Sequence, residues 1–254
     1  MSESNSTPLI RKNIELKELL TLATPDELTV LVDILLNQEK KRLFYNDGAR
    51  QQLRQYRAQG ELYKAASIIE TEILALGSNT IALAFRKGAT VSYDEVVRDV
   101  ARKLDIEVPQ GDTVHEVEQR ILEDLHSKLS EYENLEDKKT LSDDVELALN
   151  SLRLLLSYRI EGRKPLSSSQ QEDRFNSHEF STYASLIAGS ATVAALSVPV
   201  IGPVVAGISA VSAYKKTAPV LELIIPAVIQ IALIRQSVIN EDYEDFFSKL
   251  RGCL

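Results

Sequence analysis

The feature that constrains the fold of this chain most strongly is a helix-start motif that occurs three times. Each copy is followed by apolar residues at helical spacing. A Ser or Thr three residues before a Glu can exchange hydrogen bonds with it across the first turn of a helix. The pattern occurs at Thr24–Glu27, Ser92–Glu95 and Thr113–Glu116. Apolar residues then recur every three or four positions, whereas alternation over the length of a strand is hard to find. The sequence therefore predicts an all-α fold, a multi-helix bundle.

Further elements follow from the same apolar spacing. Pro25 suits the first helical position after Thr24, and a shorter helix over roughly 13–22 precedes it. A helix from Ser142 to Leu156 is closed by Gly162 and Pro165. We expect a last helical stretch over 220–239, which carries only Glu222 and Arg235 as charges, and then an acidic C-terminal segment over 241–254.

A helix over Leu62–Leu76 is expected to stop at Gly77, because glycine readily adopts the left-handed conformation of a helix C-cap. Asn79 would then cap the start of the next short helix, and Gly88 would end it. The sequence thus predicts a tight corner between two helices at this point.

A long uncharged stretch lies near the C-terminus. Phe180 to Tyr214 spans 35 residues without a charge, and the Pro- and Gly-containing run 198–203 divides it into two halves. Each half would extend about 16 to 24 Å as a helix, short of the ~30 Å hydrocarbon core of a bilayer. We therefore expect a Gly/Ala-rich apolar helical hairpin that amphipathic helices cover. Its candidate membrane or interaction residues are Ala188, Gly189, Val198, Pro199, Gly202, Pro203, Val205, Gly207, Lys215 and Lys216.

The polar, serine-rich run 166–177 separates two regions of different composition. We expect a charged amphipathic helical region over 1–165, this linker, and a region over 178–254 that holds the hairpin and the C-terminal helices. The N-terminus lacks an apolar signal-peptide core, and Cys253 is the sole cysteine. A cytoplasmic location is expected, with peripheral or conditional insertion at the inner membrane as the alternative.

Composition and motifs argue against several functional classes. A net charge of -8 disfavours a general affinity for nucleic acid. His115-Glu116 lacks a second histidine one turn later, because position 119 is Gln, so a zinc-protease motif is excluded. The chain has no phosphate-binding loop and no nucleophile elbow around Ser209. The sequence therefore predicts a non-enzymatic protein with no cofactor, no metal site and no identified small-molecule substrate.

Several short motifs resemble one family. They are Gly77-Ser78-Asn79-Thr80 followed by Arg86, Gly88, Tyr93, Glu95 and Asp99-Val100, the run Glu18-Leu19-Leu20 to Leu36, Gly202-Pro203-Val204, Ala210-Val211, and Ile225 to Ala232. Together they are similar to the uncharacterised bacterial YaaW-like proteins over roughly 14–130 and 185–238. The central part of that family has a distant likeness to a ubiquinol-cytochrome c reductase assembly chaperone. The resemblance implies an all-helical scaffold that works as a binding module, without an established cofactor.

The same motif supplies five candidates for polar recognition or a structural tie: Asn79, Arg86, Tyr93, Glu95 and Asp99. An arginine can contact a carboxylate through two parallel hydrogen bonds, so Arg86 is expected to pair with Glu95 or Asp99. The pair would serve either as a recognition site or as an internal tie within the helical bundle.

Three functions remain open at this stage. The first is a conditional membrane-associating effector, toxin-like or active in phage defence, that acts through the uncharged hairpin. The alternative is a soluble assembly chaperone or protein-binding module, and a hydrolase ranks third. Membrane lipid or a hydrophobic protein would be the partner, with self-association also open, and a hairpin that simply forms static core is the competing explanation.

Overall fold

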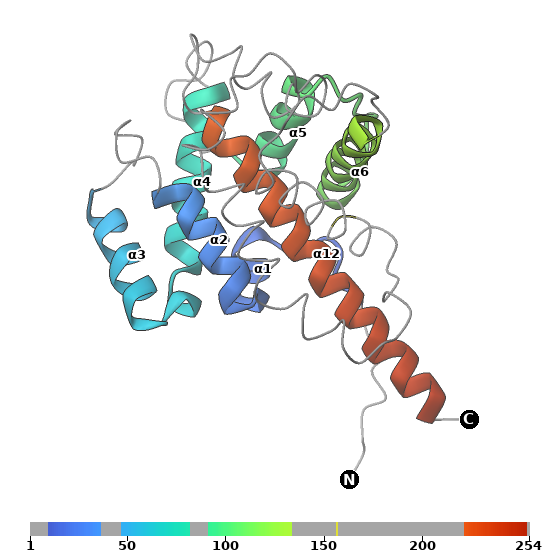
Figure 1. Cartoon of the computed structure of the whole chain (residues 1–254), viewed down its shortest axis with the longest axis horizontal. Helices are drawn as coiled ribbons and strands as arrows, with labels where there is room; N and C mark the ends of the chain where they lie inside the picture. The colour runs from blue at the N-terminus through green and yellow to red at the C-terminus, as the bar shows by residue number, and fades with distance from the viewer. Residues whose placement is uncertain (1–9, 37–46, 82–90, 134–155, 157–220, 253–254) are drawn as a thin grey trace.

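Helices make up the regular structure of the described residues. The computed structural model describes residues 10–36, 47–81, 91–133, 156 and 221–252, and within these ranges it contains seven α-helices and no strand (Figure 1). The all-α prediction is confirmed. The helices are α1 (Leu16–Leu22), α2 (Pro25–Leu36), α3 (Asp47–Gln59), α4 (Ala66–Ile81), α5 (Tyr93–Lys103), α6 (Val114–Glu133) and α12 (Leu221–Gly252), with a 3-10 turn at Leu62–Lys64 before α4.

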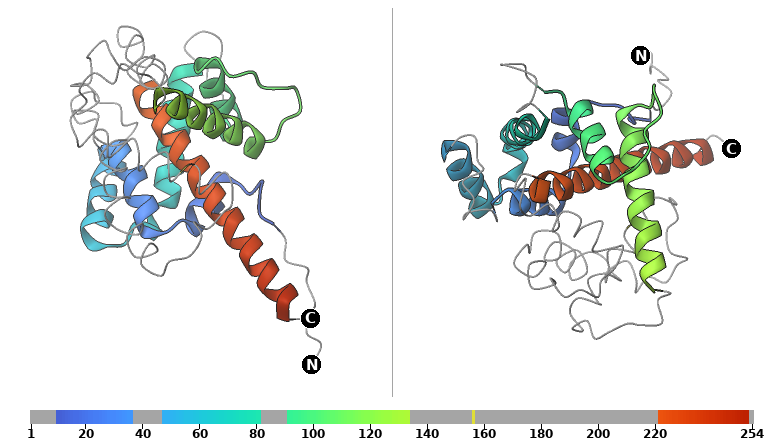
Figure 2. Two further views of the ribbon diagram at one scale, coloured as in Figure 1. Left: turned by 45° about the vertical axis from the view of Figure 1, so that its right-hand side comes forward. Right: turned by 90° about the horizontal axis from the view of Figure 1, so that it is seen from above.

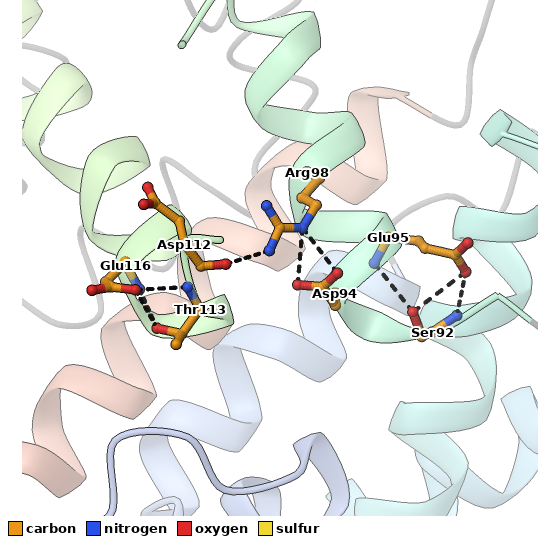
Figure 3. A network of polar contacts seen from close by, with 7 residues as sticks. All are labelled: Ser92, Asp94, Glu95, Arg98, Asp112, Thr113 and Glu116. Atoms are coloured by element: carbon orange, nitrogen blue, oxygen red, sulfur yellow. Dashed lines mark hydrogen bonds and ion pairs between the residues drawn. The ribbon is translucent and has the colours of Figure 1, made fainter. Parts of the chain in front are cut away.

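All three predicted capping boxes form at the starts of helices. They pair Thr24 with Glu27 at α2, Ser92 with Glu95 at α5, and Thr113 with Glu116 at α6. At α5 the backbone N of Ser92 donates to Glu95 Oε2 at 3.0 Å, and the Glu95 N donates to Ser92 Oγ at 3.3 Å (Figure 3). These bonds satisfy N–H groups that the first turn of a helix leaves without intrahelical partners.

The predicted corner at Gly77 and Asn79 is wrong. Helix α4 runs without a break from Ala66 to Ile81, so Gly77 does not end it and Asn79 does not begin another helix. A side-chain carbon added at Gly77 would collide with the Val96 side chain of α5. This glycine therefore serves close packing between two helices, a role that the sequence spacing alone does not distinguish from a cap.

Charged groups secure the connection between α5 and α6. Arg98 Nε donates to Asp94 Oδ2 at 2.9 Å on its own helix, and its Nη2 donates to the carbonyl oxygen of Asp112 before α6 (Figure 3). Arg120, two turns into α6, contacts Asp112 Oδ2 at 2.7 Å. These bonds hold the connecting loop against both helices and fix the start of α6.

Helix α12 is the central element of the fold. It lies against α1, α2, α4, α5 and α6, and its residues share one hydrophobic core with those helices (Figures 1 and 2). The helix predicted over 220–239 is present, but it ends later than predicted. One helix of 32 residues continues through the acidic sequence to Gly252.

The described C-terminal region is thus one long apolar helix and not a hairpin. The hairpin predicted within 180–214 and the linker predicted at 166–177 lie outside the described residues. The division into regions over 1–165 and 178–254 therefore stays a prediction, although α12 packs into the same core as the N-terminal helices.

Candidate functional site

Arg235 is the centre of a buried polar network on α12. Its side chain is only 1% exposed, and its Nε donates to Glu118 Oε2 of α6 at 2.5 Å. Its Nη1 donates to two backbone carbonyl oxygens of the segment before α1, Ile14 at 2.9 Å and Lys12 at 3.2 Å. One guanidinium thereby ties α12 to α6 and to the N-terminal segment.

Tyr93 adds α5 to this network. Its hydroxyl donates to Glu118 Oε1 at 2.8 Å, so the carboxylate accepts hydrogen bonds from two different helices. Burial raises the pKa of Tyr93 well above its ordinary value, and the nearby Glu118 charge adds to that rise. Burial also raises the pKa of Glu118, although Arg235 partly offsets the effect. The arrangement is a buried ion pair, in which removing one partner is expected to be costly.

A second buried hydrogen bond links α12 to α2. Gln230 Nε2 donates to the backbone carbonyl oxygen of Glu27 at 3.1 Å. The Glu27 side chain is itself buried and accepts from Thr24 in the capping box. The apolar part of α12 is therefore held by specific polar contacts as well as by packing.

A third contact holds α12 where it leaves the core. The backbone N of Arg11 donates to Asp242 Oδ2 at 2.8 Å, and its Nη2 donates to Asp242 Oδ1 at 2.6 Å. Burial alone would raise the pKa of Asp242, but the hydrogen bonds from Arg11 outweigh it and hold that pKa below its ordinary value. The N-terminal segment is thus fastened to α12 beyond the last core residues.

Beyond Asp242 the helix carries an exposed apolar stripe, defined here as Tyr243, Phe247 and Leu250. Their side chains are 38%, 52% and 45% exposed, and the end of α12 extends past the other described helices (Figure 1). The rings of Tyr243 and Phe247 stack with centroids 6.5 Å apart, while Phe246 and Phe247 meet edge to face at 5.6 Å. A cluster of exposed aromatic groups of this kind is typical of an interaction surface.

The structure places the predicted polar residues in separate roles. Tyr93 enters the buried network with Glu118, Glu95 caps α5, and Asp99 pairs with Arg102 at 3.0 Å on the surface. Asn79 lies within α4 instead of at a helix start. Arg86 lies outside the described residues, so its pairing stays a prediction.

The predicted hairpin residues Ala188, Gly189, Val198, Pro199, Gly202, Pro203, Val205, Gly207, Lys215 and Lys216 also lie outside the described residues.

Sequence reasoning missed Arg235 and Glu118 as a pair. A signal for each was present, because Arg235 is a rare charge in an apolar stretch and Glu118 falls on the apolar stripe of α6. Their partnership was not visible, because 117 positions separate them.

Among the described residues, no three His, Cys, Asp or Glu side chains gather as a metal site would require. Residues Leu223–Gly252 form one helix that is long and apolar enough to cross a membrane by length and composition. The core helix of a soluble protein meets the same criteria, and most of this apolar stretch is buried.

Comparisons with known proteins add no identification. The chain matches no family model, no curated protein and no solved structure.

Proposed function

We propose that this protein is a conditional membrane-associating effector that keeps an apolar helix within a sheath of amphipathic helices and releases it to a bilayer when its state changes. One observation carries the proposal. The apolar part of α12, residues 221–239, lies in the centre of the fold against five other helices. As a straight helix, its 19 residues extend about 28 Å, close to the ~30 Å hydrocarbon core of a bilayer.

The position of Arg235 is compatible with such a transfer. A charge at the centre of a membrane helix costs about 2.5 to 3.5 kcal/mol on insertion scales. Arg235 lies four residues before Ile239, the last apolar residue of the stretch, so its Cα would lie only about 6 Å from the polar end. The long side chain can extend its charge to the interface from there. In the folded protein the same charge is neutralised by Glu118.

In this proposal, Glu118 is the residue that keeps α12 in the folded position. While it pairs with Arg235, α12 is held against α6, and loss of the pair would lower the free energy that keeps α12 in the core. The uncharged segment 180–214 is the second apolar element available for the bilayer. A toxin-like or phage-defence effector of a bacterium is the setting we propose.

The test compares vesicle flotation and dye release for wild type, Glu118→Gln and Glu123→Gln. Both variants remove one negative charge from α6, but Glu118 is buried against Arg235 and Glu123 is exposed. Vesicles of phosphatidylethanolamine and phosphatidylglycerol are used at pH 7 and pH 5, after each protein is checked for folding. We expect Glu118→Gln to bind vesicles under milder conditions than wild type and Glu123→Gln to behave as wild type.

Val205→Asp in the same assay assigns the inserting element, because a charge there should suppress binding only if the segment 180–214 enters the bilayer. If folded wild type and Glu118→Gln both remain unbound at every pH and lipid composition, the membrane function is rejected.

The exposed stripe favours a second candidate, a protein-binding module or assembly chaperone that presents Tyr243, Phe247 and Leu250 to a hydrophobic client. Flotation also separates this function from the first. A chaperone is expected to stay in the soluble fraction when no client is present.

A further inference from the structure

The end of α12 beyond Asp242 is a surface with a self-complementary arrangement of charge. At about 100° per residue, Tyr243, Phe247 and Leu250 fall within roughly 60° of arc and form one narrow apolar face. Glu244 and Arg251 flank this face on one side. Asp242 and Lys249 flank it on the other, where Asp242 pairs with Arg11 and Lys249 pairs with Asp245 within the same chain. On each side the acidic residue comes first along the chain and the basic residue about two turns later.

This order specifies the direction in which a second helix can pair. In an antiparallel arrangement about a two-fold axis, each flank meets the same flank of the other helix, running in the opposite direction. Glu244 then faces the second copy's Arg251, and the two-fold axis repeats this contact at the other end of the pair. In a parallel arrangement the two opposite flanks meet, which places Glu244 beside Asp242 and Arg251 beside Lys249. Like charges at that spacing are unfavourable.

We infer that two copies of this chain associate through antiparallel pairing of the ends of their α12 helices, with the apolar stripe of one packed on that of the other. The surface extends clear of the remaining described helices, so a second helix can approach it (Figures 1 and 2). The Arg11–Asp242 contact fixes the base of the extension and gives it a defined direction. The inference does not depend on the proposed membrane function, because the pairing needs no lipid.

The size of the surface indicates a weak dimer. The 12 residues 241–252 extend about 18 Å, and three partly exposed side chains per copy cover well under the ~1,200 Å² typical of stable interfaces. We expect dissociation constants of about 10 to 100 µM, as for small transient interfaces. Dimers would then form at high local concentration and separate on dilution.

Sedimentation velocity of the full chain from about 5 to 500 µM tests this inference. Wild type is expected to shift from monomer to dimer over that range. Phe247→Ser should weaken association at least tenfold and leave the melting temperature within a few degrees, because Phe247 is half exposed. Tyr63→Ser is the matched control, since Tyr63 is an exposed aromatic residue far from the stripe in the sequence and should not change association.

Charge exchange tests the direction of pairing. Glu244→Arg and Arg251→Glu each place like charges opposite one another in an antiparallel dimer, so each variant alone should dimerise at least tenfold more weakly than wild type. Mixing the two variants restores opposite charges at both contacts and should restore association. The double variant Glu244→Arg/Arg251→Glu should also dimerise as wild type does.

Three outcomes would overturn the inference. The first is a wild-type chain that stays monomeric at 500 µM. The second is a large loss of thermal stability in Phe247→Ser, which would mean that the chain's own residues cover the stripe. The third is a Phe247→Ser variant that still dimerises as wild type does but no longer binds vesicles. That result would assign the stripe to lipid.

Discussion

Single buried polar residues determine how the helices of this protein fit together. Glu118 accepts from Tyr93 and Arg235, and Arg235 also donates to the carbonyl oxygens of Lys12 and Ile14. Each group compensates for the loss of hydration that its partner suffers on burial. The contacts therefore specify one relative position of α5, α6, α12 and the N-terminal segment, which apolar packing alone would specify less sharply.

Tyr93→Phe tests the contribution of one bond in this network. The substitution preserves the ring but removes the donor to Glu118 Oε1, leaving a buried carboxylate with one hydrogen bond fewer. We expect the free energy of unfolding to fall by about 1 to 3 kcal/mol. Urea denaturation measures it, with Tyr63→Phe at an exposed position as the control. Equal stability of both variants would show that the network contributes little.

His115 gives the protein a defined acid sensitivity. Burial, together with Lys12 and Arg235, lowers the pKa of His115 below its ordinary value of 6.5. The unfolded chain then takes up a proton at higher pH than the folded chain, so His115 makes folding less favourable as pH falls below about 6.5, until its lowered pKa is reached. We expect the stability of wild type relative to His115→Gln to decline by up to about 1.4 kcal/mol per pH unit in that window.

Denaturant unfolding of both proteins from pH 7.5 to 5 isolates this effect, because all other groups contribute to both curves. A constant difference between the curves would contradict the assignment. An increase in the relative stability of wild type at lower pH would reverse its sign.

Close packing between two elements explains the unusual course of α4. Gly77 lies inside the helix, although glycine is among the poorest helix formers. Its missing side chain lets α4 approach Val96 of α5, so the packing gain outweighs the weak local propensity. The neighbouring helix α5 is itself held at its start by the capping box and at its middle by the Arg98 contacts.

Gly77→Ala is therefore expected to destabilise the protein despite the better helix propensity of alanine. The added methyl group meets Val96, and overpacking of this kind costs about 1 to 3 kcal/mol, against a propensity gain of about 1 kcal/mol. The measurement is thermal or urea unfolding. Val96→Ala in the same chain should recover part of the loss, and Gly252→Ala, with open space around it, should be close to neutral. A stabilised Gly77→Ala would refute the close contact.

At the scale of the whole molecule, α12 supplies the centre around which α1, α2, α4, α5 and α6 pack. It contributes twelve buried apolar residues, which are Leu223, Ile224, Ile225, Ala227, Val228, Ile229, Ile231, Ala232, Leu233, Ile234, Val238 and Ile239. Burying a large aliphatic side chain stabilises a fold by about 1.5 to 3 kcal/mol, while whole domains are stable by only about 5 to 15 kcal/mol. We therefore expect that the other described helices do not form a stable core without α12.

Two truncations test how much the apolar part of α12 and its C-terminal end each contribute to stability. A chain that ends at Asn240 retains every buried apolar residue of the helix and loses mainly the Arg11–Asp242 contact, so it should still unfold cooperatively. A chain that ends at Pro219 lacks the central helix and should show no cooperative transition. Calorimetry distinguishes the two. Cooperative unfolding of the shorter chain would mean that the other helices form a core without α12.

The sequence predicted some elements well because their signals are local. Capping boxes at Thr24, Ser92 and Thr113 involve residues three apart, and all three form as expected. The role of Gly77 was predicted wrongly because a C-cap and a close helix contact both favour glycine. The last helix was predicted to end at Ile239 because the polarity changes there, although the backbone continues as one helix to Gly252.

Of the buried network, the sequence listed Tyr93 among five candidates for a polar contact but gave none of its partners. The residues that Tyr93 joins come from α6 and α12, and a partnership between segments so distant in the chain leaves no local pattern. Glu95 and Asp99 resembled recognition residues because charge alone does not separate a helix cap or a surface ion pair from a binding group.

By itself, the sequence determined the all-α class, the starts of the capped helices and the strongly apolar character of the C-terminal helix, because these depend on hydrogen bonds and side-chain spacing within a few turns. The tertiary structure alone decided that α12 lies at the centre, that Arg235 is neutralised by Glu118 and that the apolar stripe at the end of α12 is exposed. Burial, ion pairing and exposure depend on which distant segments meet, so they are properties of the packed molecule and not of any short stretch of its chain.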